Sequence, residues 1–187
     1  MSNHARGLWG YTGRTANGPE LTVQATGMGG PSAAIVLADL ARLGVRRAVR
    51  IGTCHGLGPD SPAGTLLLVG EALAGGGSAA AFGVAGGAGV APDPELLGGL
   101  RDELGGDAIE ARIVSLDTIH RVDDPPPEAA GADLQTVAVL GRARQLEIAT
   151  AAVLIVSEGE SGERLPDEQL ETAAKRCGQA AAAVLLT

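Results

Sequence analysis

Apolar positions along the chain fall into short blocks whose spacing alternates between that of strands and that of helices. Continuous or alternating apolar runs predict strands at residues 21–26, 45–52, 65–73, 111–116 and 149–157. Apolar residues three and four positions apart predict helices at residues 31–43, 94–104, 133–147 and 167–186. The Gly- and Ala-rich residues 75–94 and the Pro-rich residues 124–130 are predicted to be loops, the former with at most one short strand.

This alternation predicts one three-layer α/β domain over residues 1–187, with helices on both faces of a mostly parallel central sheet. The length is sufficient for a single full core, and no repeat or linker divides the chain. Ligands of such sheets bind beyond the carboxyl ends of the strands. The candidate site loops are therefore residues 27–32, 52–58 and 157–163.

Composition narrows the classes of partner. Twenty-two acidic residues outnumber fourteen basic ones, so the net charge is −8 and we expect no nucleic-acid partner. The longest apolar runs are too short to cross a bilayer, and residues 1–10 lack the features of a signal peptide. Cys54 and Cys177 stand in no metal-ligand spacing, which predicts neither a metal site nor a disulfide. We expect a cytoplasmic protein that does not contact membranes.

The few aromatic residues are concentrated near the start of the chain. Trp9 and Tyr11 are two of its three aromatic side chains. Leaving such rings in water forgoes roughly 1.5–3 kcal/mol each. We therefore expect this segment to pack against the domain.

Residues 26–32 read Thr-Gly-Met-Gly-Gly-Pro-Ser and connect a predicted strand to a predicted helix. Their glycines let backbone N–H groups approach a ligand, and the helix N-terminus favours an anion or a polar sugar edge. A Rossmann site needs Gly-x-Gly-x-x-Gly and, about 20 residues on, an acidic residue at the end of a second strand. The sequence has Gly-x-Gly-Gly-Pro and carries Arg50 in its next strand, which disfavours a dinucleotide site. A tight turn without a ligand stays open as an alternative.

Residues 50–56 read Arg-Ile-Gly-Thr-Cys-His-Gly and form the second motif. A buried arginine is costly unless it is paired, so Arg50 must meet a carboxylate or an anionic ligand. With the hydroxyl of Thr53 it would form a clamp for a phosphate or a carboxylate. The alternative is an internal salt bridge from Arg50 to Asp133 or to Glu158.

The nucleoside phosphorylase family carries a paired signature that two of these segments resemble, TGMGGPSAAI followed by VRIGTCHG. Three further segments are similar to family motifs in the same order, RGLWGYTG, DLQTVAVL and LIVSE. The resemblance extends over nearly the whole chain. It implies a phosphorylase-like fold that cleaves the N-glycosidic bond of a purine or pyrimidine nucleoside. It also implies inorganic phosphate as co-substrate, no cofactor, and a homodimer or hexamer.

The resemblance also assigns roles to individual residues. It implies that phosphate is bound by Arg6, Gly29, Arg50 and Thr53, with Arg6 reaching into a neighbouring subunit. It implies that the nucleoside is contacted by Met28, Thr53, Cys54, Ile119, His120, Leu134 and Gln135. Glu158 falls where the family has an aspartate that protonates the leaving base, and with Arg50 it forms the implied catalytic pair.

Several positions depart from the family pattern. The family's first strand and its Gly-Asp-Pro phosphate loop would precede Arg6, where only five residues stand here, so we expect part of the phosphate site to be missing. Gln135 replaces a glutamate that bridges the ribose hydroxyls, and Ile119 replaces an aromatic ring that covers the base. His55 replaces a glycine, with a structural or a ligand-binding role.

Some of these residues also have explanations that involve no ligand. Cys54 is equally explained as a small packed residue. Glu158, Glu160 and Glu163 are explained as a solvated acidic loop. Two classes of function therefore remain open: an enzyme that uses phosphate or water to cleave a nucleoside, and a non-catalytic relative that binds a nucleoside or phosphosugar or acts as an assembly subunit.

Overall fold

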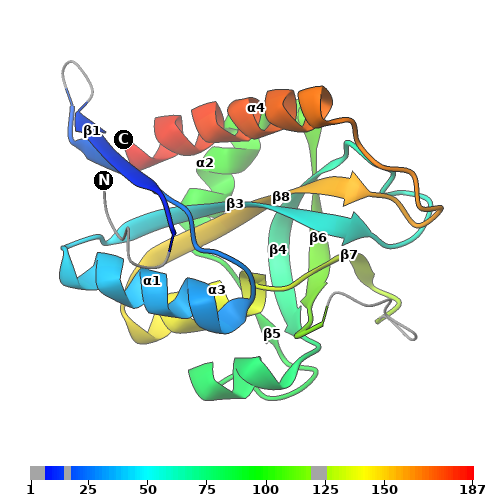
Figure 1. The fold of residues 1–187 in the computed structure, drawn as a ribbon, viewed down its shortest axis with the longest axis horizontal. Helices are drawn as coiled ribbons and strands as arrows, with labels where there is room; N and C mark the ends of the chain where they lie inside the picture. The colour runs from blue at the N-terminus through cyan, green and yellow to red at the C-terminus, as the bar shows by residue number, and fades with distance from the viewer. Residues whose placement is uncertain (1–6, 15–17, 119–125) are drawn as a thin grey trace.

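The computed structural model describes residues 7–14, 18–118 and 126–187, and the structural statements below concern those residues. The predicted site residues Arg6, Ile119 and His120 lie outside them. The described chain forms an α/β domain in which helices cover a central sheet (Figure 1). The predicted α/β class is confirmed.

The central sheet contains six strands. In spatial order they are β5 (Gly89–Val90), β4 (Leu66–Ala74), β6 (Ala108–Ser115), β7 (Ala129–Asp133), β3 (Arg47–Gly56) and β8 (Ala149–Glu158). The two longest pairings, β3 with β8 and β4 with β6, are parallel, as is β6 with β7. The pairings of β3 with β7, β4 with β5 and β4 with β8 are antiparallel, so the sheet is mixed. Because β8 pairs with both β3 and β4, the sheet from β4 to β8 closes on itself.

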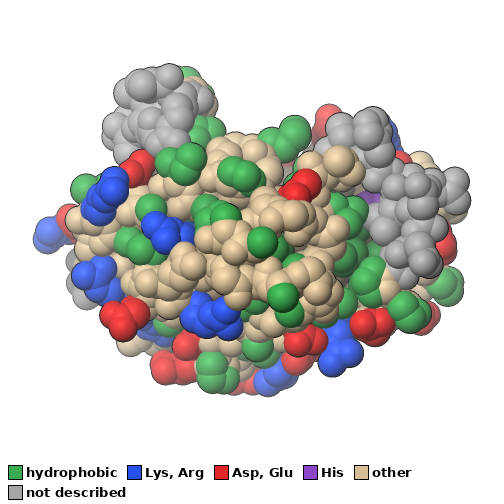
Figure 2. Space-filling model, turned by 90° about the horizontal axis from the view of Figure 1, so that it is seen from below, with side chains coloured by type: hydrophobic (Ala, Val, Ile, Leu, Met, Phe, Trp, Pro, Cys, Tyr) green, Lys and Arg blue, Asp and Glu red, His purple; other side chains and the backbone are tan. Residues whose placement is uncertain are grey.

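Helices cover this sheet on two sides (Figure 1). The pair α1 (Gly30–Arg42) and α3 (Thr136–Gln145) packs on one side through a cluster that includes Leu37 and Val139. The pair α2 (Pro94–Leu104) and α4 (Asp167–Leu185) packs on the other through a cluster that includes Leu68, Leu96 and Ala180. On the outer face below α1 and α3, basic and acidic side chains are interspersed, as on a solvated helix surface (Figure 2).

The continuous apolar runs of the sequence correspond to strands that are buried on both faces. In β4, Leu66 and Leu68 belong to the α2/α4 side, whereas Leu67 and Val69 belong to the cluster enclosed by the closed sheet. Successive side chains of a strand point to opposite faces, so a strand covered on both sides must be apolar throughout. The same explanation holds for β8, in which residues 150–156 are all buried.

Several helix boundaries are confirmed together with their causes. The carboxylate of Asp93 accepts hydrogen bonds from the backbone N–H groups of Glu95 and Leu96 and so caps α2. In α1, Pro31 occupies the first turn, where its missing N–H is not needed. Gly44 follows the helix with a positive φ of 96°.

Four elements differ from the prediction. The segment assigned to a loop and a helix start contains strand β7, and α3 begins only at Thr136. The Gly-rich segment contains the 3-10 helix η2 (Gly77–Phe82), and a second one, η3 (Gly105–Asp107), follows α2. Strand β7 is short and rich in Ala and Gly, so its apolar pattern is too weak to distinguish it from a loop.

The prediction that the N-terminal aromatic rings are buried is wrong. Strand β1 (Gly10–Arg14) pairs only with β2 (Glu20–Gln24) as an antiparallel hairpin, separate from the central sheet (Figure 1). The residues Trp9 and Tyr11 are 56% and 65% exposed. A two-stranded ribbon has no second layer, so the side chains on its outer face stay in water.

Candidate functional site

The three predicted site segments converge on one open cleft of about 1220 Å³ beside β3, β7 and β8. The second of them is not a loop as predicted, because β3 continues to Gly56. Eight of the predicted site residues line it: Met28, Gly29, Arg50, Thr53, Cys54, Leu134, Gln135 and Glu158. Because β3 and β8 run parallel, their carboxyl ends lie at the same edge of the sheet. The cleft therefore lies where the strand pattern predicts a ligand.

The glycine loop enters the cleft from the start of α1. Gly27 and Gly29 have φ values of 72° and 84°, which residues with a side chain rarely adopt. The hydroxyl of Ser32, in the first turn of α1, donates to the carbonyl of Thr26 at 2.7 Å and closes the loop on the helix. The loop thus presents backbone and the exposed Met28 at the rim, next to a helix N-terminus.

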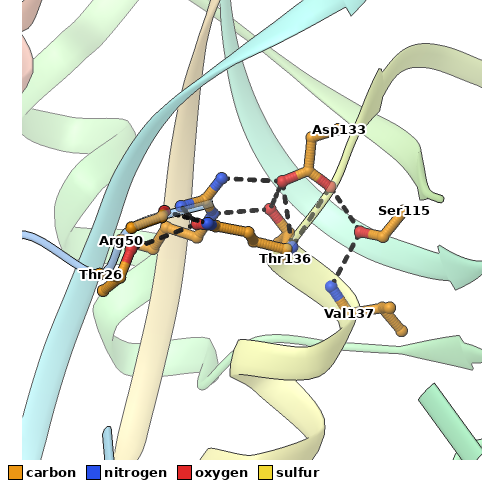
Figure 3. Close-up of polar contacts among 8 residues, drawn as sticks. Thr26, Arg50, Ser115, Asp133, Thr136 and Val137 are labelled. Carbon is orange, nitrogen blue, oxygen red and sulfur yellow. Dashed lines mark hydrogen bonds and ion pairs between the residues drawn. The ribbon is translucent and has the colours of Figure 1, made fainter. Parts of the chain in front are cut away.

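Arg50 lies at the centre of a buried polar network at the inner wall of the cleft (Figure 3). Its Nη2 donates to Asp133 Oδ2 at 2.9 Å, and its Nη1 donates to Gln135 Oε1 at 2.7 Å. Its Nε donates to Thr136 Oγ1 at 3.0 Å. The Arg50 side chain is only 12% exposed and that of Asp133 is not exposed at all. The internal salt bridge, one of the two alternatives for Arg50, is therefore present.

Gly52 makes this arrangement of Arg50 possible. Residues 50 and 52 lie on the same face of β3, so the guanidinium folds back over position 52. A Cβ at Gly52 would stand 2.6 Å from Nη2 of Arg50 and 2.8 Å from its Cζ. Glycine at this position is thus needed for the ion pair rather than for ligand contact.

Asp133 connects three elements through its two carboxylate oxygens (Figure 3). Besides Arg50, they accept from the Ser115 hydroxyl at the end of β6 and from the backbone N–H and hydroxyl of Thr136. Ser115 Oγ in turn accepts from the backbone N–H of Val137 at 2.9 Å. The first N–H groups of α3 are therefore satisfied by the strand ends that build the cleft.

Two polar side chains on β3 remain available to a ligand. Thr53 is exposed, and its hydroxyl makes no hydrogen bond to another residue in the described part of the chain. His55 is half-buried, lines the cleft, and likewise has no side-chain partner among the described residues. The register of β3 against β8 shifts between Cys54 and His55, so His55 stands opposite Glu158. Bulges of this kind often redirect side chains beside binding sites.

Cys54 is a packed residue, as one alternative predicted, although it borders the cleft. Its side chain belongs to the central apolar cluster and is 4% exposed. Burial, followed by the nearby charge of Asp133, raises the pKa of its thiol to about 12. The thiol is therefore protonated at neutral pH and is no nucleophile.

Hydrogen bonds to the carboxylates of Glu158 and Glu163 hold the acidic loop after β8. Glu158 Oε2 accepts from Nε of Arg164 at 2.9 Å, and the same two residues form an isolated antiparallel bridge. Glu163 accepts from the Ser161 hydroxyl and the Ala63 backbone N–H, which lowers the pKa of its carboxyl. Glu158 and Glu160 line the cleft, so the acidic residues of this loop differ in environment.

Three contributors to the site have no counterpart in the sequence-based predictions, namely Ser115, Thr136 and Arg164. Ser115 was detectable as a polar residue that follows the apolar pair Ile113 and Val114 near the carboxyl end of a predicted strand. Arg164 carries no such signal, because only the return of the loop brings it to Glu158. Asp133 had appeared only as one of two possible partners of Arg50.

Both cysteines of the chain are free. Within the described ranges no group of three or more His, Cys, Asp or Glu side chains is arranged to hold a metal ion. No described helix is both long and apolar enough to cross a membrane.

Individual known proteins match parts of this chain, and one protein family matches nearly all of it. A DeoD-type purine nucleoside phosphorylase from Clostridium perfringens is 43% identical over 67 residues, which are 35% of this chain and 28% of that protein. A second one, from Geobacillus kaustophilus, is 44% identical over 59 residues, 31% of this chain and 25% of that protein. A uridine phosphorylase from Treponema pallidum is 40% identical over 70 residues, 37% of this chain and 27% of that protein.

These stretches thus span only about a quarter of the relatives they match. In contrast, the family described as Phosphorylase superfamily matches residues 2–187, which is nearly the whole chain. This match agrees with the mixed α/β fold. The chain belongs to the phosphorylase superfamily.

Proposed function

We propose that this protein is a nucleoside phosphorylase, a pentosyltransferase that cleaves the N-glycosidic bond of a purine or pyrimidine nucleoside with inorganic phosphate. The observation that carries the proposal is the convergence of the glycine loop, Arg50, Thr53 and Glu158 on one cleft. Membership of the superfamily and partial likeness to purine nucleoside and uridine phosphorylases support the same activity.

In this proposal phosphate binds between the glycine loop and β3. The hydroxyl of Thr53 and the backbone N–H groups near Gly29 donate to its oxygens. Three of the five N–H groups of Arg50 are used internally, so two remain for the anion. A phosphate oxygen attacks the anomeric carbon of the sugar as the bond to the base breaks, and the base leaves with the bonding electrons.

Glu158 is proposed to deliver a proton to the departing base. It lies at the end of β8 and lines the cleft, and its side chain is 34% exposed. Arg164 pairs with its carboxylate at 2.9 Å and fixes the direction in which it points. A general acid must come within about 3 Å of its target, so a base that approaches β3 and β8 would have to displace Arg164 or bind beside it.

Hydrolysis is the second candidate reaction, and the Arg50–Asp133 ion pair favours it. Among the described residues, the charged side chains lining the cleft are two arginines, Arg50 and Arg164, and three carboxylates, Asp133, Glu158 and Glu160. A cleft with this balance attracts phosphate weakly and accepts a neutral nucleoside and water. A non-catalytic relative that binds a nucleoside or phosphosugar is the third reading.

Assembly into a homodimer or hexamer is part of the proposal. Large apolar side chains are exposed on the hairpin and on α1, including Tyr11, Val23, Ile35 and Leu43 at 51–76%. Surfaces of this kind are typical of protein interfaces. Arg6, which lies outside the described residues, would then reach a neighbouring subunit's phosphate. Elution as a monomer in size-exclusion chromatography with light scattering would rule out this role of Arg6.

The test is the release of free base from a panel of purine and pyrimidine nucleosides, with and without inorganic phosphate. Release that requires phosphate and is lost in Glu158→Ala supports phosphorolysis. Release that does not depend on phosphate supports hydrolysis. If no nucleoside is cleaved but nucleosides raise the melting temperature, the protein binds without turnover. Glu163→Ala serves as control, because this carboxylate contacts Ser161 and the Ala63 backbone and does not line the cleft.

A further inference from the structure

Gln135 joins the glycine loop to the arginine strand through both ends of its amide. Its Oε1 accepts from Arg50 Nη1 at 2.7 Å and from Thr26 Oγ1 at 3.3 Å. Its Nε2 donates to the carbonyl of Gly27. The residue itself is only 6% exposed. A side chain at the N-cap of α3 thus holds two segments that are 85 and 108 positions away in sequence.

The partners determine which way the amide must face. An arginine N–H can only donate and a backbone carbonyl can only accept. The oxygen of the amide must therefore face Arg50 and its nitrogen must face Gly27. Both lone pairs of Oε1 are occupied, and a single N–H of Nε2 is left for a ligand.

We propose that Gln135 is a positioning residue that clips the glycine loop onto the Arg50–Asp133 ion pair. In this arrangement the loop around Gly27 is held in its ligand-binding conformation before any ligand arrives. The assignment deepens the proposed function, because the same loop lines the nucleoside cleft, but it rests on contacts within the free protein. It also explains why an amide, rather than an acid, stands at this position.

A carboxylate of the same shape could not make all of these contacts. It would keep the bond from Arg50 but would face the Gly27 carbonyl with an acceptor, leaving that carbonyl without its donor. It would also place a second negative charge beside Asp133, while Arg50 supplies only one positive charge. Substituting the acid that the resemblance associates with ribose binding is therefore expected to loosen this site rather than to improve it.

The experiment compares the full-length protein with Gln135→Glu and Gln135→Met by hydrogen exchange of the backbone amides. Gln135→Met keeps the size and removes all three side-chain hydrogen bonds. We expect the amides of residues 26–33 to exchange about tenfold faster in both variants, while those of β8 are unchanged. Gln145→Glu is the matched control, because this exposed glutamine at the end of α3 forms its only side-chain hydrogen bond within the described part of the chain with Arg142.

A kinetic readout separates positioning from mere stability. For a substrate cleaved by the wild type, KM for the nucleoside should rise about tenfold in Gln135→Glu, with a smaller change in kcat. Unchanged exchange at residues 26–33 in Gln135→Glu, or an unchanged or lower KM, overturns the assignment. If the wild type cleaves no nucleoside, the proposed function fails, yet faster exchange in the variants still upholds the role of Gln135.

Discussion

Arg50 Nη2 and Asp133 Oδ2 lie 2.9 Å apart at the inner wall of the cleft, with the two side chains 12% and 0% exposed. The ion pair links strand β3 to the end of β7 and, through Asp133, to the first turn of α3. A buried pair of this kind recovers its desolvation cost only when the remaining hydrogen-bonding groups are also satisfied. Here the hydroxyls of Ser115 and Thr136 complete the shell of the carboxylate.

Removal of Asp133 should therefore destabilise the fold strongly. In Asp133→Ala the Arg50 guanidinium stays buried without a counter-charge, and the start of α3 loses its acceptor. We expect the free energy of unfolding to fall by about 3–5 kcal/mol, measured by urea denaturation. Glu171→Gln, which breaks the exposed Lys175–Glu171 pair on α4, should change it little. Equal effects of the two substitutions would contradict a structural role for the buried pair.

A methyl group at position 52 should disturb the same pair from the other side. The Cβ of Gly52→Ala would stand 2.6 Å from Arg50 Nη2, so the guanidinium would have to leave Asp133. We expect a loss of about 1–3 kcal/mol in the free energy of unfolding. Gly98→Ala in α2 meets no atom within 4 Å and should gain about 0.5–1 kcal/mol, as glycine is a poor helix former. A Gly52→Ala protein as stable as the wild type would show that Arg50 does not need this space.

His55 should matter for ligand binding and not for stability. Its ring lines the cleft and has no partner in the described part of the chain, so His55→Ala removes no internal hydrogen bond. We expect the melting temperature to change little and the Kd for a bound nucleoside to rise by up to about tenfold. Isothermal titration with the preferred nucleoside measures the second quantity. The control is Ile109→Ala, an exposed residue of β6 outside the cleft; a matching Kd in both variants would remove His55 from the binding site.

Alkaline pH should destabilise the protein through its buried thiols. Burial raises the pKa of Cys54 to about 12 and that of Cys177 to about 11, against 9.0 for an ordinary thiol. Above pH 9.0 the unfolded chain therefore holds fewer protons than the folded one, and the free energy of unfolding falls as pH rises toward the folded values.

The measurement is the urea midpoint at about pH 8 and about pH 10.5. Cys54→Ala should show a smaller decline between the two values than the wild type, because one buried thiol is gone. An identical decline would mean that Cys54 ionises as readily in the folded protein as in the unfolded one.

Local pattern was enough to predict most elements of the fold. The unbroken apolar runs of β4 and β8 indicated strands buried on both faces, and Asp93 together with Pro94 marked the start of α2. These signals lie within a few residues of the element they specify. Strands β1 and β7 were not predicted from the sequence, because the first belongs to an exposed hairpin and the second has a weak Ala- and Gly-rich pattern.

Some features of the site could likewise be predicted from the sequence, and others could not. The sequence by itself determined which residue types stand at the strand ends, and hence that Arg50 had to be paired and that the glycine loop had to turn tightly. Only the tertiary structure decided that the partner of Arg50 is Asp133, 83 positions away. It also decided that the amide of Gln135 hydrogen-bonds to the Gly27 carbonyl of the glycine loop. The reason is physical: Asp133 and Glu158 both end strands beside β3, and contacts distant in sequence decide their partners. The pairing of β7 with β3 brings Asp133 to the guanidinium, whereas the return of the loop after β8 brings Arg164 to Glu158.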